Sequence, residues 1–244
     1  MWDNPRALNA IANLLYAAAL AAILAAGLLW AARQPAFALE RLTVVGGLER
    51  TTHEQVRAVA ARDVGGTFFT VDLARLRGGF EQLPWVRSAR IERRWPAELE
   101  VAIEEHRVLA RWNGRALVNV HGEVFDAAYD GELPALSGPE GTAREVAERF
   151  VAARAALASV GLEPAVMELS ARGAWRLALA GGARLELGRE QLDERLARFV
   201  AAYRDGLHRL SFEVEYVDLR YPHGFAVRVP KEFRDSPKER GAQG

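Results

Sequence analysis

The chain has no cysteine, only two methionines, and no excess of charge of either sign. The lack of cysteine excludes structural disulfides, iron–sulfur clusters and thiolate zinc sites. Lys+Arg and Asp+Glu both number 32, which argues against the basic surface that general nucleic-acid binding needs. The five histidines are scattered, and there is no GxSxG, P-loop or GxGxxG motif. We therefore expect no catalytic residue, cofactor, metal, nucleic acid or small-molecule substrate.

A long apolar run does occur near the N-terminus, from Ala7 to Ala32. It is free of charge, is longer than the ~20 residues that cross hydrocarbon as a helix, and is bracketed by Trp2 and Trp30. A buried soluble helix is one alternative. A cleaved signal peptide is another, because residues 35–38 (PAFA) resemble a cleavage site, but signal h-regions are usually ~7–15 residues long. We predict an uncleaved signal anchor over 7–32.

The orientation of this anchor is only weakly encoded, because basic residues on its two sides are nearly balanced. A short tail at 1–6 beside a long folded region favours a cytoplasmic tail and a soluble part outside the cytoplasm.

Residues 37–106 predict a small domain in the order β-α-α-β-β. Capping-box spacing, either Thr51 with Glu54 or Thr52 with Gln55, begins the first helix. Asp72 is the expected cap of the second helix, which the pair Gly78-Gly79 should weaken by up to about 1 kcal/mol per glycine. The two later strands flank Pro96, and a slip in the alternation of the first indicates a bulge.

Charged residues lie along these two strands. Arg87, Arg90, Arg93 and Arg94 form either a basic docking face or, as we prefer, the solvated side of a strand pair. In the second case they would face Glu98, Glu100 and Glu104.

Residues 107–230 predict a second domain, a mixed and mainly antiparallel sheet with helices on one face. Asn113-Gly114 indicates a hairpin turn, and Gly122–Gly138 is expected to be a loop. Thr142 and Glu145 have capping-box spacing at the start of a helix. Three strands are expected at Val166–Ser170, Trp175–Ala180 and Arg184–Gly188. A second helix is expected at about Gln191–Tyr203. A charged flexible tail is expected over 231–244.

The domain closes with YVDLRYPHGFAVRV, Tyr216 to Val229, a hairpin with Pro222-His223-Gly224 at its turn. The first arm is expected to pair with the rest of the sheet, which leaves the second arm as an edge strand. Such an edge is either covered, here by the charged tail, or used to bind a partner by strand addition.

Several pieces of this sequence are specific together. Leu83-Pro84-Trp85-Val86 and Arg94-Trp95-Pro96 follow a membrane helix, and LGR (187–189), RLARF (195–199) and YVDLRY (216–221) come later in that order. In this the chain resembles the FtsQ/DivIB family of bacterial cell division proteins, over almost its whole length from the membrane helix to Val229. The resemblance implies an α+β fold with one transmembrane helix, a POTRA domain over 37–106 and a β domain over 107–230.

The resemblance also implies a function, that of a non-enzymatic scaffold of the division complex. The protein would sit in the inner membrane with its C-terminal domain in the periplasm, enriched at the septum. It would link early division proteins to later ones and recruit FtsB, and FtsL through FtsB, by strand addition. The transmembrane helix and POTRA domain would meet other division proteins. The implied FtsB site comprises Tyr221, Gly224, Phe225, Ala226, Val227, Val229 and Arg172; Pro222-His223 and Arg228 depart from commoner members.

Two other functions fit parts of the sequence. POTRA domains also occur in envelope assembly and secretion factors, although these usually continue into an outer-membrane barrel rather than follow a helical anchor. A membrane-anchored cell-wall hydrolase would need paired carboxylates, for which Asp126 and Asp130 are candidates, but solvated acids are the simpler interpretation.

Overall fold

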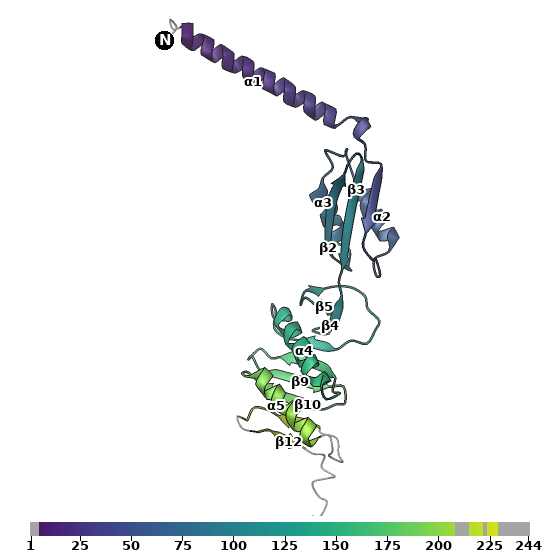
Figure 1. Cartoon of the computed structure of the whole chain (residues 1–244), viewed down its shortest axis with the longest axis vertical. Helices are drawn as coiled ribbons and strands as arrows, with labels where there is room; N and C mark the ends of the chain where they lie inside the picture. The colour runs from purple at the N-terminus through teal and green to yellow at the C-terminus, as the bar shows by residue number, and fades with distance from the viewer. Residues whose placement is uncertain (1–4, 208–214, 222–223, 229–244) are drawn as a thin grey trace, which may run out of the picture. The chain divides into compact units, whose positions relative to one another are not determined.

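The computed structural model describes residues 5–207, 215–221 and 224–228 (Figure 1). It divides into two compact units, residues 1–106 and 107–244. Val229, the turn residues Pro222 and His223, and the expected tail over 231–244 lie outside the described residues.

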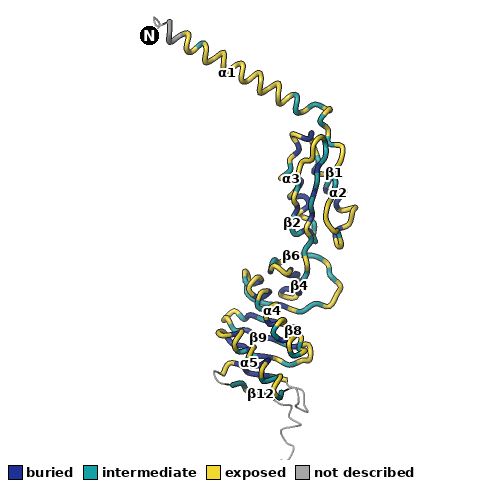
Figure 2. The backbone as a smooth tube through the Cα atoms, in the orientation of Figure 1, coloured by how far each residue is buried: buried dark blue, intermediate teal, exposed yellow. Residues whose placement is uncertain are grey.

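The predicted membrane helix is present as α1, Pro5–Ala32. At ~1.5 Å per residue its 28 residues extend about 42 Å, which exceeds the ~30 Å of a hydrocarbon core. The span Asn9–Ala32 has a mean hydropathy of 2.2 and is the only helix of this kind in the described part of the chain. Figure 2 shows α1 exposed along almost all of its length. An apolar helix with nothing packed around it is suited to a membrane.

The first soluble region forms the predicted β-α-α-β-β arrangement. In the three-stranded sheet β3 is central, with β1 parallel and β2 antiparallel to it. The bounds are β1 Arg41–Val45, α2 His53–Asp63, α3 Leu73–Glu81, β2 Val86–Arg94 and β3 Glu98–Glu105. Both helices bury side chains in one core with Leu99 and Val101 of β3, so they cover one face of the sheet. The predicted bulge occurs between Val86 and Ser88.

Helix starts follow the predicted caps in two of three cases. Thr52 and Gln55 form the full capping box of α2, and Asp72 accepts a hydrogen bond from the Arg75 backbone N–H in α3. The predicted box at Thr142 is wrong: its hydroxyl donates to the Pro139 carbonyl at 2.7 Å instead of accepting from the helix. The hydroxyl is therefore directed to a carbonyl of the preceding turn rather than to the backbone N–H groups of α4.

The two adjacent glycines of α3, Gly78 and Gly79, have different surroundings. A Cβ on Gly79 would lie 2.2 Å from Asp63 Oδ2 and 3.0 Å from Val59 Cγ1, whereas one on Gly78 would meet nothing within 4 Å. The missing side chain at Gly79 thus lets α2 and α3 approach closely, a gain that offsets the poor helix propensity of glycine.

Two of the four strand arginines pair with glutamates across the sheet, as preferred. Arg87 meets Glu104 and Arg94 meets Glu100, both at 3.0 Å. Arg93 is different, because its guanidinium donates to two backbone carbonyls in the loop before α3. Arg93 therefore connects β2 to this loop and is not part of a solvated face.

The second unit is built on a nine-stranded mixed sheet in the order β12-β11-β10-β9-β8-β7-β4-β5-β6. The strands are β4 Val108–Trp112, β5 Ala116–Asn119, β6 Val124–Phe125, β7 Ala135–Ser137, β8 Pro164–Leu169, β9 Trp175–Leu179, β10 Arg184–Gly188, β11 Tyr216–Asp218 and β12 Ala226–Arg228. The helices α4 Ala143–Ala158 and α5 Leu192–Asp205 pack into a single core with it. Three of its eight strand pairings are parallel and five antiparallel, in line with the expected mainly antiparallel sheet.

The Asn113-Gly114 turn confirms its prediction. Both residues have positive φ, 49° and 74°, and the Arg115 N–H bonds to the Trp112 carbonyl at 3.1 Å. Positive φ at both central positions is typical of a type I′ hairpin turn.

The expected loop Gly122–Gly138 is wrong in part, because it contains β6 and β7. Strand β7 even lies inside the sheet, between β4 and β8 and parallel to both. It has only three residues, flanked by Pro134 and Gly138, and buries the single side chain Leu136. Such a short strand has no detectable alternation, and its position depends on partners far away in sequence.

Candidate partner-binding site

The closing hairpin lies where the sequence places it. β11 pairs with β10, and β12 pairs with β11 and ends the sheet order. Since β10 and β11 are parallel, the chain must cross over between them, and α5 lies in that connection. Among the described residues no strand pairs with the outer side of β12. The expectation that the second arm forms an edge strand is confirmed.

The register shows which backbone groups face this edge. The Arg184 N–H donates to the Glu215 carbonyl, and the Leu219 N–H donates to the Glu186 carbonyl. The backbone N–H and C=O groups of odd-numbered residues in and beside β11 therefore point towards β10. Even-numbered residues of β11 therefore face β12, where Asp218 is opposite Ala226. Because backbone directions alternate along a strand, the N–H and C=O of Val227 point away from β11. Val227 is thus positioned to bond an additional strand.

The side chains of β12 alternate between the two faces of the sheet. Phe225 and Val227 are half-buried and pack against the core, whereas Ala226 and Arg228 are exposed. The Arg228 guanidinium lies over the Tyr216 ring, 5.2 Å from its centroid. A partner strand would meet Phe225 and Val227 chiefly through their backbone, and Ala226 through its side chain.

Two interactions hold the hairpin near its turn. Arg198 of α5 donates to the Tyr221 carbonyl at 3.0 Å. Arg220 donates through its backbone N–H and its guanidinium to the carboxylate of Asp218, with the shortest contact 2.6 Å. Hydrogen bonding to Arg220 holds the pKa of the buried Asp218 carboxyl below its ordinary value, against the opposing effect of burial.

The remaining described residues of the predicted site lie at or near this turn end of the hairpin. Tyr221 is 55% exposed and follows β11, while Gly224 is half-buried before β12. Arg172 is exposed in the turn between β8 and β9. This turn lies at the same end of the sheet as Tyr221 and Gly224, because Glu168, Arg176, Glu186, Asp218 and Ala226 form one row across the strands. Three strand spacings, about 14 Å, separate β9 from β12.

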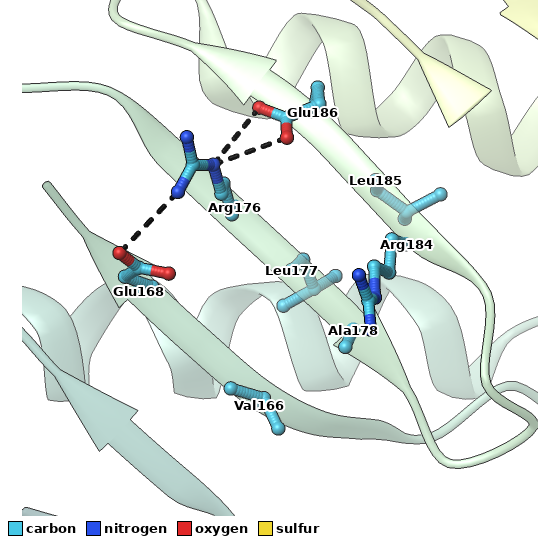
Figure 3. A pocket seen from close by; sticks show the side chains of 8 residues that line it. All are labelled: Val166, Glu168, Arg176, Leu177, Ala178, Arg184, Leu185 and Glu186. Carbon is cyan, nitrogen blue, oxygen red and sulfur yellow. Dashed lines mark hydrogen bonds and ion pairs between the residues drawn. The ribbon is translucent and has the colours of Figure 1, made fainter. Parts of the chain in front are cut away.

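The same row marks the open face of the sheet, opposite the helices. Figure 3 shows Arg176 between Glu168 and Glu186, at 3.5 Å and 3.2 Å, in a shallow depression. The acids and bases in it neutralise one another. The described residues contain no cluster of side chains that could hold a metal. Asp126 and Asp130 are exposed in the loop before β7, so neither is set in an enclosed cleft.

Sequence reasoning missed Asp218, Arg220 and Arg198 as supports of this site. Asp218 and Arg220 are two positions apart, on one side of an extended segment, so their pairing was available from the sequence. Arg198 has no such signal, because its partner is a backbone carbonyl more than twenty positions away.

Comparison with known proteins agrees with this architecture. Residues 37–106 match the FtsQ-type POTRA domain, and residues 110–220 match the C-terminal domain of the cell division proteins FtsQ/DivIB. The chain is 43% identical over 236 residues to the cell division protein FtsQ of Burkholderia pseudomallei, covering 94% of each protein. It is 40% identical over 233 residues to FtsQ of Nitrosospira multiformis, covering 93% of this chain and 99% of the relative.

Proposed function

This chain belongs to the FtsQ/DivIB family of cell division proteins, and we propose that it recruits the FtsB–FtsL complex by strand addition at β12. The family is one of non-enzymatic division proteins with a membrane-spanning helix, which sets aside the wall-hydrolase alternative. The proposal concerns the partner, the binding site and the cellular location.

The observation that supports the proposal is the outward backbone of Val227 on an unpaired edge. Main-chain bonds along such an edge supply affinity, and flanking side chains supply specificity. A strand of FtsB placed beside β12 would extend the sheet. Its residue opposite Ala226 would continue the row that begins at Glu168, on the open face.

Side chains at the turn end of the strands supply specificity for the partner. Tyr221 offers an exposed ring and Arg172 an exposed cation that has no ion pair among the described residues. An acidic residue in FtsB just beyond the added strand would pair with Arg172. Val229, which lies outside the described residues, belongs to the same proposed site.

We place the protein in the inner membrane, with its N-terminal tail in the cytoplasm, its C-terminal domain in the periplasm and its concentration highest at the septum. In this arrangement α1 and the POTRA domain contact other division proteins. Tethering this protein and FtsB in one membrane raises their effective concentration, so a small edge interface suffices.

A pair of substitutions at Val227 tests the proposal. Val227→Pro removes the outward N–H without removing a β11–β12 bond, while Val227→Ala trims the side chain but keeps that N–H. Loss of one main-chain bond of ~1 kcal/mol predicts roughly fivefold weaker FtsB–FtsL binding for the proline variant relative to the alanine variant. Equal affinities of the two variants, measured by titration calorimetry on the full-length chain, would reject strand addition at β12.

A further inference from the structure

Four aromatic side chains form a cluster at one end of the POTRA domain: Phe37, Phe68, Phe69 and Trp95. The Phe69 ring lies edge-to-face with Phe37 and Phe68, at centroid distances of 5.1 and 5.2 Å, and Phe68 lies 5.8 Å from Trp95. Phe69 is 48% exposed and Trp95 71%. Two large aromatic rings that remain exposed side by side indicate a surface that another apolar phase covers.

This cluster is close to the membrane by covalent connection. Phe37 follows the end of α1 at Ala32 by five positions, a distance of at most about 18 Å for an extended chain. The Thr67 hydroxyl also donates to the Ala32 carbonyl at 2.6 Å, which ties the loop of Phe68 and Phe69 to the helix end. The headgroup layer of a bilayer is about 5–8 Å thick on each side, so a domain tied to the end of a spanning helix lies within reach of it.

The cluster is fixed in place before any contact with lipid. Arg93 donates to the carbonyls of Phe68 and Val71 at 2.7 and 3.0 Å, which joins the aromatic loop to the end of β2. The Phe68 N–H bonds to the Phe37 carbonyl at 2.8 Å. Ordering these rings therefore costs little additional entropy on binding.

The chemistry around the cluster favours a lipid surface. Aromatic side chains, tryptophan above all, are enriched at the headgroup level of membranes. Arg33 and Arg41 are exposed close by in sequence and form no ion pair within the described residues, so both are available to anionic headgroups.

We propose that the aromatic cluster inserts into the headgroup layer and holds the base of the POTRA domain on the membrane surface. The contact restricts the orientations that the domain samples above its anchor. The inference rests on α1 spanning a membrane and is independent of partner binding at β12.

The absence of cysteine makes a site-specific test direct, because one introduced cysteine gives one labelled position. Gly65→Cys lies in the loop that leads to the cluster, and Gly47→Cys lies beyond the opposite end of β1; an added Cβ meets nothing within 4 Å at either glycine. Each variant of the full chain would be labelled with a fluorophore and placed in nanodiscs of phosphatidylcholine and phosphatidylglycerol. A lipid with a spin label on its headgroup serves as quencher.

The proposal predicts stronger quenching at position 65 than at 47, and loss of this difference when Phe69→Ser and Trp95→Ser are added. Trp95→Ser alone removes the more exposed ring. This single variant replaces the double variant in the test if the double variant does not fold, as judged by the lack of a cooperative melting transition. Phe69→Tyr with Trp95→Phe should keep the difference. Equal quenching at both positions would overturn the proposal. A difference that persists in the serine variants would also overturn it, because proximity would then come from the short connection alone. Failure of the chain to enter nanodiscs would instead contradict the membrane helix.

Discussion

The carbonyl oxygen of Tyr221 accepts a hydrogen bond from the guanidinium of Arg198, 3.0 Å away on α5. Tyr221 is the last described residue before the turn of the closing hairpin, and α5 packs into the core beneath the sheet. The contact therefore links the proposed binding edge to a helix of the domain core.

We expect Arg198→Ala to weaken FtsB–FtsL binding more than it lowers stability. The substitution should lower the free energy of unfolding by on the order of 1 kcal/mol, because the hydrogen bond is partly exposed to water. Arg204→Ala is the matched control, because Arg204 lies on the same helix but contacts Ser159, the C-cap residue of α4. Titration calorimetry and thermal melting of both variants separate the two effects. Equal affinities for the two variants would show that the Tyr221 contact does not position the edge.

The two adjacent glycines of α3 should respond oppositely to alanine. Gly78→Ala is expected to stabilise the POTRA domain by roughly 0.5–1 kcal/mol, because the site is open and alanine is the better helix former. Gly79→Ala should destabilise it, since the new Cβ would collide with Asp63 and Val59. Denaturant unfolding of both variants checks this, and the same sign of change in both would contradict the packing of α2 against α3.

The carboxylate of Glu105 should contribute to stability in a pH-dependent way. Burial raises its pKa, but backbone N–H groups of Glu49, Arg50 and Thr51 bond to it and hold the pKa below its ordinary value of 4.5. A lowered folded-state pKa means that the contribution is complete above about pH 4.5 and is lost as the pH falls through the folded-state value.

Glu105→Gln should therefore flatten the acid side of the stability–pH curve while lowering stability at neutral pH. Glu104→Gln is the control, because the carboxylate of Glu104 is more exposed than that of Glu105 and pairs with Arg87. Thermal melting over a pH series measures both. An unchanged acid slope in the Glu105 variant would show that this carboxylate is not the group responsible.

Charge reversal at Arg172 should weaken FtsB–FtsL binding and reduce its salt dependence, because an exposed ion pair acts mainly through steering and modest attraction. Arg154→Glu provides the comparison, since Arg154 is exposed on α4, on the helix-covered side of the sheet. Association rates measured at two salt concentrations distinguish the variants. Similar rates for both would remove Arg172 from the proposed site.

Much of the fold could be predicted because its signals are local. The charge-free run of α1, the Thr52 capping box, the Asn113-Gly114 turn and the closing hairpin all depend on neighbours in sequence. The order of the POTRA elements followed from the same kind of signal.

What local patterns do not reveal mostly has a different cause. Strand β7 depends on parallel partners remote in sequence, and Gly79 on the approach of another helix. Thr142 is a local exception, because its hydroxyl donates to the carbonyl of Pro139, three positions earlier. For the proposed site, sequence located the edge strand but not the Arg198 contact that fixes it. Apart from Thr142, the decisive interaction in each case is tertiary, so no local pattern encodes it.

Hydrogen exchange of the Val227 amide is the measurement that tests the central claim most directly. The full-length chain in nanodiscs would be followed with and without FtsB–FtsL, with the Ala226 amide, which faces β11, as internal reference. Strand addition predicts that Val227 exchanges quickly in the free protein and is strongly protected in the complex, while Ala226 changes little. A Val227 amide that exchanges equally fast in the complex would contradict the account.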